Sequence, residues 1–126
     1  MARIITAIVL FVHGFAHLVG FVGPWRLSKS IPYKTTILAG RFDLGDAGIK
    51  AIGVVWLLMA LVFAVAGAGA LLHARWWPLF TVVIAGLSTL LCIIGLPDAK
   101  IGVPVNLAIL VYVLLAWKLG WSWAIR

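Results

Sequence analysis

The chain has 126 residues, of which 65% are hydrophobic and only 10% are charged, and its formal net charge is +7. So much apolar sequence excludes an ordinary soluble domain and predicts an integral membrane protein with a single domain. The basic residues stand at the ends of apolar segments without any nucleic-acid-binding motif, so we expect no nucleic acid partner, and the single cysteine, Cys92, excludes an internal disulfide.

The first apolar stretch, residues 4–22, is long enough to cross a bilayer as a helix, which takes about 20 residues. It continues past two histidines without a small-residue cleavage site, so we expect a retained span rather than a signal peptide. His13 and His17 are four residues apart and therefore lie on one face of this helix. Because imidazoles are costly to place in lipid, both should face protein, water or a ligand.

A long polar link at 23–47 follows the first span and leaves room for a short interfacial helix. Asp43, Asp46 and Lys50 fall on one helical stripe, which predicts that the second helix begins before its apolar part at 51–72. Trp56 lies in the middle of this span. A core position is favoured for it over the wall of a pocket.

Two tight turns, at 73–76 and 97–101, connect the remaining apolar stretches at 51–72, 77–96 and 103–117 and make them antiparallel neighbours. Stretches of this length without period-2 alternation fit helices rather than barrel strands. The third span carries a stripe of small or weakly polar residues, which is typical of close helix packing in membranes: Thr81, Ala85, Ser88, Cys92 and Gly95. The predicted fold is an all-α membrane protein, a bundle of four transmembrane helices.

Aromatic and basic residues predict how the bundle sits in the bilayer, because Trp and Tyr favour the headgroup level. Trp25 and Tyr33 would lie on the side of the long link, and a larger group would lie on the other side: Trp76, Trp77, Trp117, Trp121 and Trp123. Six basic residues on the link side against four on the other favour a cytoplasmic link with both termini outside. The excess is small, so dual insertion stays open.

Polar residues gather at the link end of the predicted bundle. The acidic residues Asp43, Asp46 and Asp98 all lie there, and so do three other polar residues: Lys50, Lys100 and Asn106. Together with His13 and His17 they predict a half-open cavity or a buried polar network, in which an Asp or Asn fixes a histidine tautomer. In the alternative, Asp98 and Lys100 cap a turn in water while the histidines bond backbone carbonyls.

His13 and His17 also have the spacing of two metal ligands on one helical turn. A complete site would need a third ligand, for which Asp46, Cys92 and Asp98 are the candidates. Two histidines on one helix cannot take both axial positions of one haem, and no other span carries a histidine. We therefore expect no cofactor, and a metal ion, if one binds, would be held by His13 and His17. No catalytic residue is predicted, since Ser88 has no identifiable base.

Three pieces of the sequence carry a resemblance: the segment HGFAHLVGF at 13–21, the pair Trp76-Trp77, and DAKIG at 98–102 with Asn106 four residues on. Together they resemble a group of small bacterial four-span membrane proteins that are often labelled "ABC transporter permease". In size and layout the chain also resembles DoxX-like four-helix membrane proteins. The resemblance implies a multi-pass protein of the bacterial cytoplasmic (inner) membrane, in which five residues belong together: His13, His17, Asp98, Lys100 and Asn106.

The expected function is a non-catalytic binding or accessory role, in which the polar end holds a small ligand, a lipid or quinone headgroup, or a partner subunit. A small dimeric transporter or channel is the second hypothesis, since four spans are few to enclose a pathway. A membrane enzyme or metal-binding protein that uses His13 and His17 is the third. The expected partners are the lipid bilayer and either a second copy of the chain or a larger membrane complex.

Overall fold

The structure is a computed structural model that describes residues 1–121 of the chain. These residues form mostly helix, together with one short hairpin in the long link. The elements in chain order are α1 (Ala2–Ala16), α2 (Leu18–Val22), β1 (Thr36–Ile37), β2 (Phe42–Asp43), α3 (Gly45–Leu71), α4 (Trp77–Ile94) and α5 (Gly102–Lys118).

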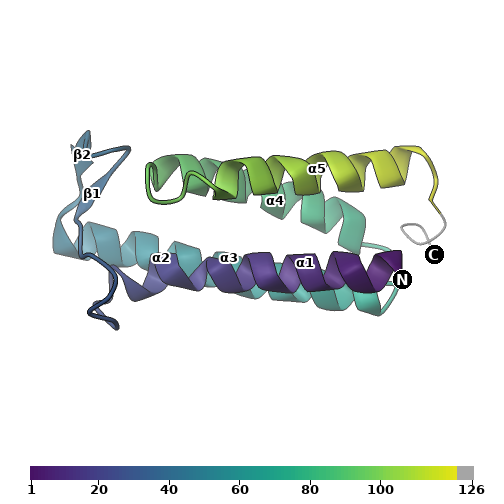
Figure 1. The fold of residues 1–126 in the computed structure, drawn as a ribbon, viewed down its shortest axis with the longest axis horizontal. Coiled ribbons are helices and arrows are strands. Elements are labelled where there is room, and N and C mark those ends of the chain that lie inside the picture. The colour runs from purple at the N-terminus through teal and green to yellow at the C-terminus, as the bar shows by residue number, and fades with distance from the viewer. Residues whose placement is uncertain (122–126) are drawn as a thin grey trace.

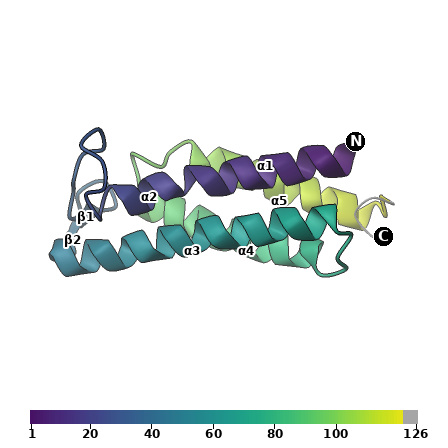
Figure 2. The ribbon, with the colours of Figure 1, turned by 90° about the horizontal axis from the view of Figure 1, so that it is seen from below.

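The helices run up and down along one axis (Figures 1 and 2). α2 follows α1 in the same direction after one residue, His17, and α3, α4 and α5 each reverse the direction of the chain. α1 packs against α3, and α4 packs against both α3 and α5. The N-terminus and the end of α5 lie at one end of the bundle, and the β1–β2 hairpin covers the other end.

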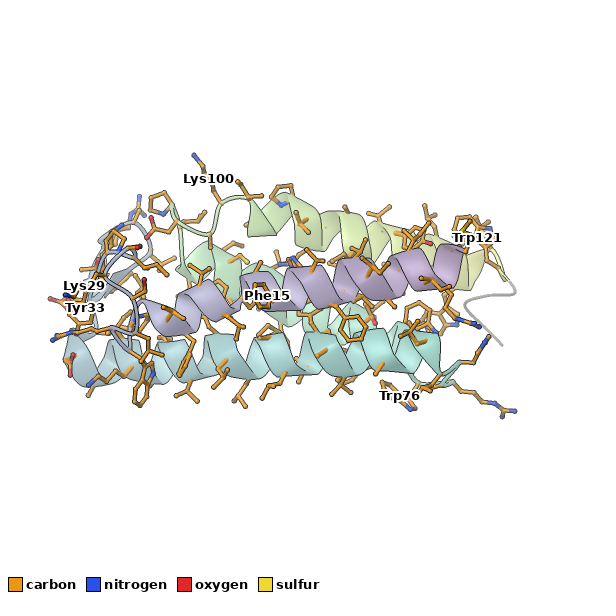
Figure 3. The ribbon with its side chains drawn as sticks, turned by 60° about the horizontal axis from the view of Figure 1, so that its bottom comes forward. Phe15, Lys29, Tyr33, Trp76, Lys100 and Trp121 are labelled. Carbon is orange, nitrogen blue, oxygen red and sulfur yellow. The ribbon has the colours of Figure 1, made fainter. Side chains whose placement is uncertain are left out.

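Three helical stretches are long and apolar enough to cross a membrane, namely Ala2–Val22 (21 residues), Gly45–Leu71 (27 residues) and Trp77–Ile94 (18 residues). α5 is also apolar and is shorter, with 17 residues. Large apolar side chains cover the outside of the helices, and Phe15 on α1 is 75% exposed (Figure 3). An apolar exterior around helices of this length is what a multi-pass membrane protein presents to lipid.

The inner faces of the helices carry the two histidines and the third-span stripe that the sequence predicts. His13 and His17 are buried together with Thr6 and Leu10 of α1, and the buried members of the stripe on α4 are Thr81, Ala85, Ser88 and Cys92. α1 and α3 come closest at Gly14, where an ideal Cβ would lie 2.8 Å from Cβ of Phe63 and 3.0 Å from the carbonyl oxygen of Ala60. The missing side chain at Gly14 therefore sets the spacing of these two helices.

The long link differs from its predicted form, because it holds a hairpin where an interfacial helix was considered. Leu38, Ala39 and Gly40 at the hairpin tip have φ angles of 51°, 56° and 84°. This left-handed backbone aims the N–H groups of Leu38 and Ala39 at the carbonyl oxygens of Ile94 and Leu96, each at 2.9 Å. Carbonyl groups at a helix C-terminus lack helical partners, so the hairpin docks where α4 leaves acceptors free.

Two further expectations concern helix starts and aromatic residues. The second helix begins at Gly45, ahead of the apolar part at 51–72, which confirms its predicted early start. The placement of Trp77 at the membrane surface is wrong, since its side chain is only 1% exposed and packs in the core beside Gly69 of α3. Trp76 and Trp121 lie at the end of the bundle opposite Lys29 and Tyr33 (Figure 3), and Trp123 is outside the described residues.

Candidate functional site

His13 and His17 face the interior of the bundle, as their position on one helical face predicts. Their exposed fractions are 8% and 3%, and their two rings meet edge to face with centroids 4.7 Å apart. Phe63 of α3 contacts both imidazoles, with ring centroids 4.8 Å from His13 and 5.2 Å from His17. The two imidazoles therefore contact protein on the inner side of α1 rather than the apolar exterior.

A chain of hydrogen bonds connects the histidines to α4 and α5. Nε2 of His13 lies 2.8 Å from Oδ1 of Asn106, and Nδ2 of Asn106 donates to Oγ of Ser88 at 2.9 Å and approaches Sγ of Cys92 at 3.5 Å. Oγ of Ser88 lies 2.7 Å from Nε2 of His17, whose Nδ1 lies 2.8 Å from the carbonyl oxygen of His13. We call His13, His17, Ser88 and Asn106 the histidine network.

The donors and acceptors of the histidine network assign its protons. A carbonyl oxygen only accepts, so Nδ1–H of His17 donates to the carbonyl of His13. In the neutral tautomer that this bond selects, Nε2 of His17 accepts from the hydroxyl of Ser88. The amide nitrogen of Asn106 donates to Ser88, so its Oδ1 accepts from Nε2–H of His13. An asparagine fixes the tautomer of one histidine, and a backbone carbonyl fixes that of the other.

Asp98 and Lys100 lie outside the histidine network, so the expectation of one network joining them to the histidines needs correction. Asp98 forms an ion pair with Lys34 of the link, with Nζ–Oδ2 at 3.0 Å. Lys100 points away from the bundle (Figure 3). Asp98 and Lys100 precede α5, whereas Asn106 lies one turn inside it, so only the Asn106 side chain reaches the interior.

Asp46 and Lys50 form a second polar group, at the surface of the link end. The Asp46 carboxylate accepts a hydrogen bond from the hydroxyl of Tyr33 and lies 3.3 Å from Nζ of Lys50 and 3.4 Å from the guanidinium of Arg26. These contacts tie the link to the start of α3. Asp43 accepts a hydrogen bond from the backbone N–H of Gly45, which holds the pKa of the Asp43 carboxyl below its usual range.

The Asp46 contacts give a testable expectation for the link. Asp46→Asn removes the charge that holds Arg26 and Lys50, so the link should detach more often and tryptic cleavage after Arg26, Lys29 and Lys34 should become several times faster. Timed digestion followed by mass spectrometry measures these rates. Lys100→Gln is the control because it removes an exposed charge from the other turn. Equal cleavage of the Asp46→Asn variant and the parent chain would show that the link is held without Asp46.

A cavity of about 780 Å³ lies between the link and the helix ends. Its lining is mostly aliphatic or proline side chains from the link, α2, α3 and the end of α4, including Val19, Ile31, Ile37, Ile49, Ile52 and Ile94. The charged residues that line it, within the part of the chain that the structure describes, are Lys34 and Asp98. A concave, mostly apolar cavity with a few polar groups is the usual form of a small-molecule site.

Trp56 stands between this cavity and the histidine network. Its ring lies 5.3 Å from the ring of His17, centroid to centroid, and it also lines the cavity. An ideal Cβ at Gly20 would lie 2.3 Å from the Trp56 ring, and one at Gly95 would lie 2.9 Å from it, so two glycines make the slot that holds the indole. Trp56 packs against the core and is also a wall of the cavity, the alternative that the sequence did not favour.

Sequence reasoning missed three residues of the site. Ser88 was assigned to helix packing, although it hydrogen-bonds two members of the histidine network. A buried hydroxyl on the inner stripe of α4, facing histidines on α1, was the available signal. Phe63 and Lys34 carried no signal in the sequence, because only the helix packing and the hairpin bring them to the histidines and to Asp98.

The proposed third metal ligands do not gather around the histidines. Within residues 1–121, no group of three or more His, Cys, Asp or Glu side chains is placed to hold a metal ion. Asp46 and Asp98 form ion pairs with basic residues of the link end, and Cys92 lies against Asn106.

Comparison with known proteins found no matching family model, no matching curated protein and no matching solved structure.

Proposed function

We propose that this chain is a multi-pass protein of a bacterial cytoplasmic membrane with a non-catalytic binding role. The single observation that carries the binding role is the cavity of about 780 Å³ at the link end, which is within the range of small-molecule sites, about 300–1,000 Å³. Its aliphatic lining favours a ligand that is itself largely apolar, such as a membrane lipid or a quinone. The sequence resemblance to small bacterial four-span proteins supports the location.

In this proposal the histidine network supports the site and does not contact the ligand. The side chains of the network satisfy one another's hydrogen-bonding groups and connect the first span to α4 and α5. Trp56 lies between the network and the cavity. Such a closed polar network specifies how the helices pack. It holds His17 in place behind Trp56, and Trp56 in turn shapes the inner wall of the cavity.

The cavity can be blocked from within by Ile52→Trp, which adds a large ring to a residue of the lining. Crowding a ligand by about 1.4 kcal/mol weakens binding tenfold, so the protein purified in mild detergent should retain at least about tenfold less bound lipid or quinone. Native mass spectrometry and solvent extraction measure what is retained. Leu58→Trp is the matched control, since Leu58 lies on the same helix, is 54% exposed and does not line the cavity.

Equal retention in the Ile52→Trp and Leu58→Trp proteins would contradict binding in this cavity. The transporter hypothesis has its own measurement, solute flux into proteoliposomes that contain this protein alone. A solute flux that Ile52→Trp abolishes would show that the protein transports solute through this cavity rather than only binding a ligand there.

A further inference from the structure

The charged residues of the cavity form a pair of opposite sign. Nζ of Lys34 lies 3.0 Å and 3.2 Å from the two carboxylate oxygens of Asp98, and both residues line the cavity. The side chains of Lys34 and Asp98 are 50% and 70% exposed, so both charges remain open to further contacts. A lone lysine would select an anion. This pair instead offers one contact for a negative group and one for a positive group, and its net charge is zero.

The inner part of the cavity has different chemistry. The side chains of Ile49, Ile52, Trp56 and Ile94 line it. An occupant that fits this part is apolar. Val19 on α2 lines the cavity and is 56% exposed, so apolar chains can leave the cavity along the outside of the bundle.

Residues that favour the level of lipid headgroups lie at the same end of the molecule as the cavity. Lys29 and Tyr33 project from this end (Figure 3). Nε1 of Trp25 donates to the carbonyl oxygen of Lys50 at 3.1 Å, which places this aromatic residue at the start of α3. Tryptophan, tyrosine and lysine at a helix end mark the boundary between hydrocarbon and water.

We infer that the cavity binds a phospholipid with a zwitterionic headgroup, with its phosphate against Lys34, its ammonium against Asp98 and its apolar chains against the isoleucines and Trp56. This inference rests on the proposed function and names its ligand. A phosphate and an ammonium placed against an existing lysine–aspartate pair complete an alternating set of four charges. A lipid with a net negative head would satisfy Lys34 and be repelled by Asp98.

The test compares two lipids with the same acyl chains, phosphatidylethanolamine (zwitterionic) and phosphatidylglycerol (anionic). The full-length protein is incubated with equal amounts of both in mild detergent, and retained lipid is counted by native mass spectrometry. We expect the parent protein to favour phosphatidylethanolamine by about fivefold, which is the affinity ratio that corresponds to the free energy of one partly exposed charge contact. Asp98→Asn should reverse this preference, because it leaves Lys34 without its partner.

Two further variants separate the inference from the proposed function. Lys29→Met is the control, because Lys29 is a lysine of the same link that does not line the cavity, and it should leave the preference unchanged. Ile52→Trp should reduce both lipids together. An unchanged lipid ratio in Asp98→Asn, or retention of a quinone with neither phospholipid, would contradict the inference of a zwitterionic ligand but leave the cavity as a binding site. Lipid retention that Ile52→Trp does not lower would contradict the proposed function itself.

Discussion

Replacing Asn106 with leucine should lower the free energy of unfolding by about 2 kcal/mol, because it breaks two buried hydrogen bonds and strands their partners. Leucine has nearly the shape of asparagine, so the loss comes from polarity rather than from a void. Nε2–H of His13 would have no acceptor, and Ser88 would lose a donor, in an interior where Asn106 itself is 0% exposed. Thermal unfolding in detergent, followed by circular dichroism, measures the change.

Two other substitutions define the comparison for Asn106→Leu. Ser88→Ala also removes two bonds, those to Nε2 of His17 and Nδ2 of Asn106, but it should cost less, about 1 kcal/mol. Only Nε2 of His17 is stranded, because Nδ2 of Asn106 keeps Sγ of Cys92 within reach at 3.5 Å. Thr89→Ala is the control on the same helix, since its hydroxyl bonds only the carbonyl of Ala85 in its own helix, and the change should be close to zero. If Ser88→Ala costs as much as Asn106→Leu, asparagine does not hold the histidine network together.

A double-mutant cycle shows whether His13 and Asn106 stabilise the protein as a pair. His13→Leu removes the other end of the 2.8 Å hydrogen bond, so the double variant His13→Leu, Asn106→Leu should lose less stability than the sum of the two single changes. Coupling in membrane helices averages about 0.6 kcal/mol, which such measurements resolve. Strict additivity would mean that the two side chains are stabilised by separate contacts.

The helical architecture was predictable because apolar length and helical period act locally along the chain. The helical first span with His13 and His17 on its inner face, the two tight turns and the inward stripe of the third span all follow from residue spacing, and the structure has them in place. Trp77 was misplaced because a tryptophan at the start of a span has two options. The aromatic preference for the membrane surface competes with core packing, and here the Trp77 side chain packs in the core, where it is 1% exposed.

The site was predictable only in part, because the contacts that build it depend on three-dimensional placement. His13, His17 and Asn106 come together, since all three lie on inward faces of their helices. The carboxylates were grouped with them because they lie at the same end of the chain layout. The sequence has no means of showing that a hairpin would bring Lys34 to Asp98 and Tyr33 to Asp46, and these pairings keep the carboxylates at the surface.

Gly14→Ala should lower the free energy of unfolding by about 2 kcal/mol, although alanine is the better helix former. The added methyl would lie 3.0 Å from the backbone carbonyl of Ala60 and 2.8 Å from Cβ of Phe63, and neither is the free end of a flexible side chain. α1 must therefore move away from α3. Because Gly14 lies between His13 and His17 in sequence, this shift also draws both imidazoles away from their partners.

Gly86→Ala is the matched control on α4, since an ideal Cβ at Gly86 meets nothing within 4 Å. This change should be neutral or raise the free energy of unfolding by up to about 1 kcal/mol through helix propensity alone, so the same substitution should have opposite signs at the two positions. Gly14→Ala should also cost less when Asn106 is already leucine, because part of its effect passes through the histidine network. Equal effects at Gly14 and Gly86 would show that the α1–α3 contact is loose, and that helix spacing does not place the histidines against Phe63.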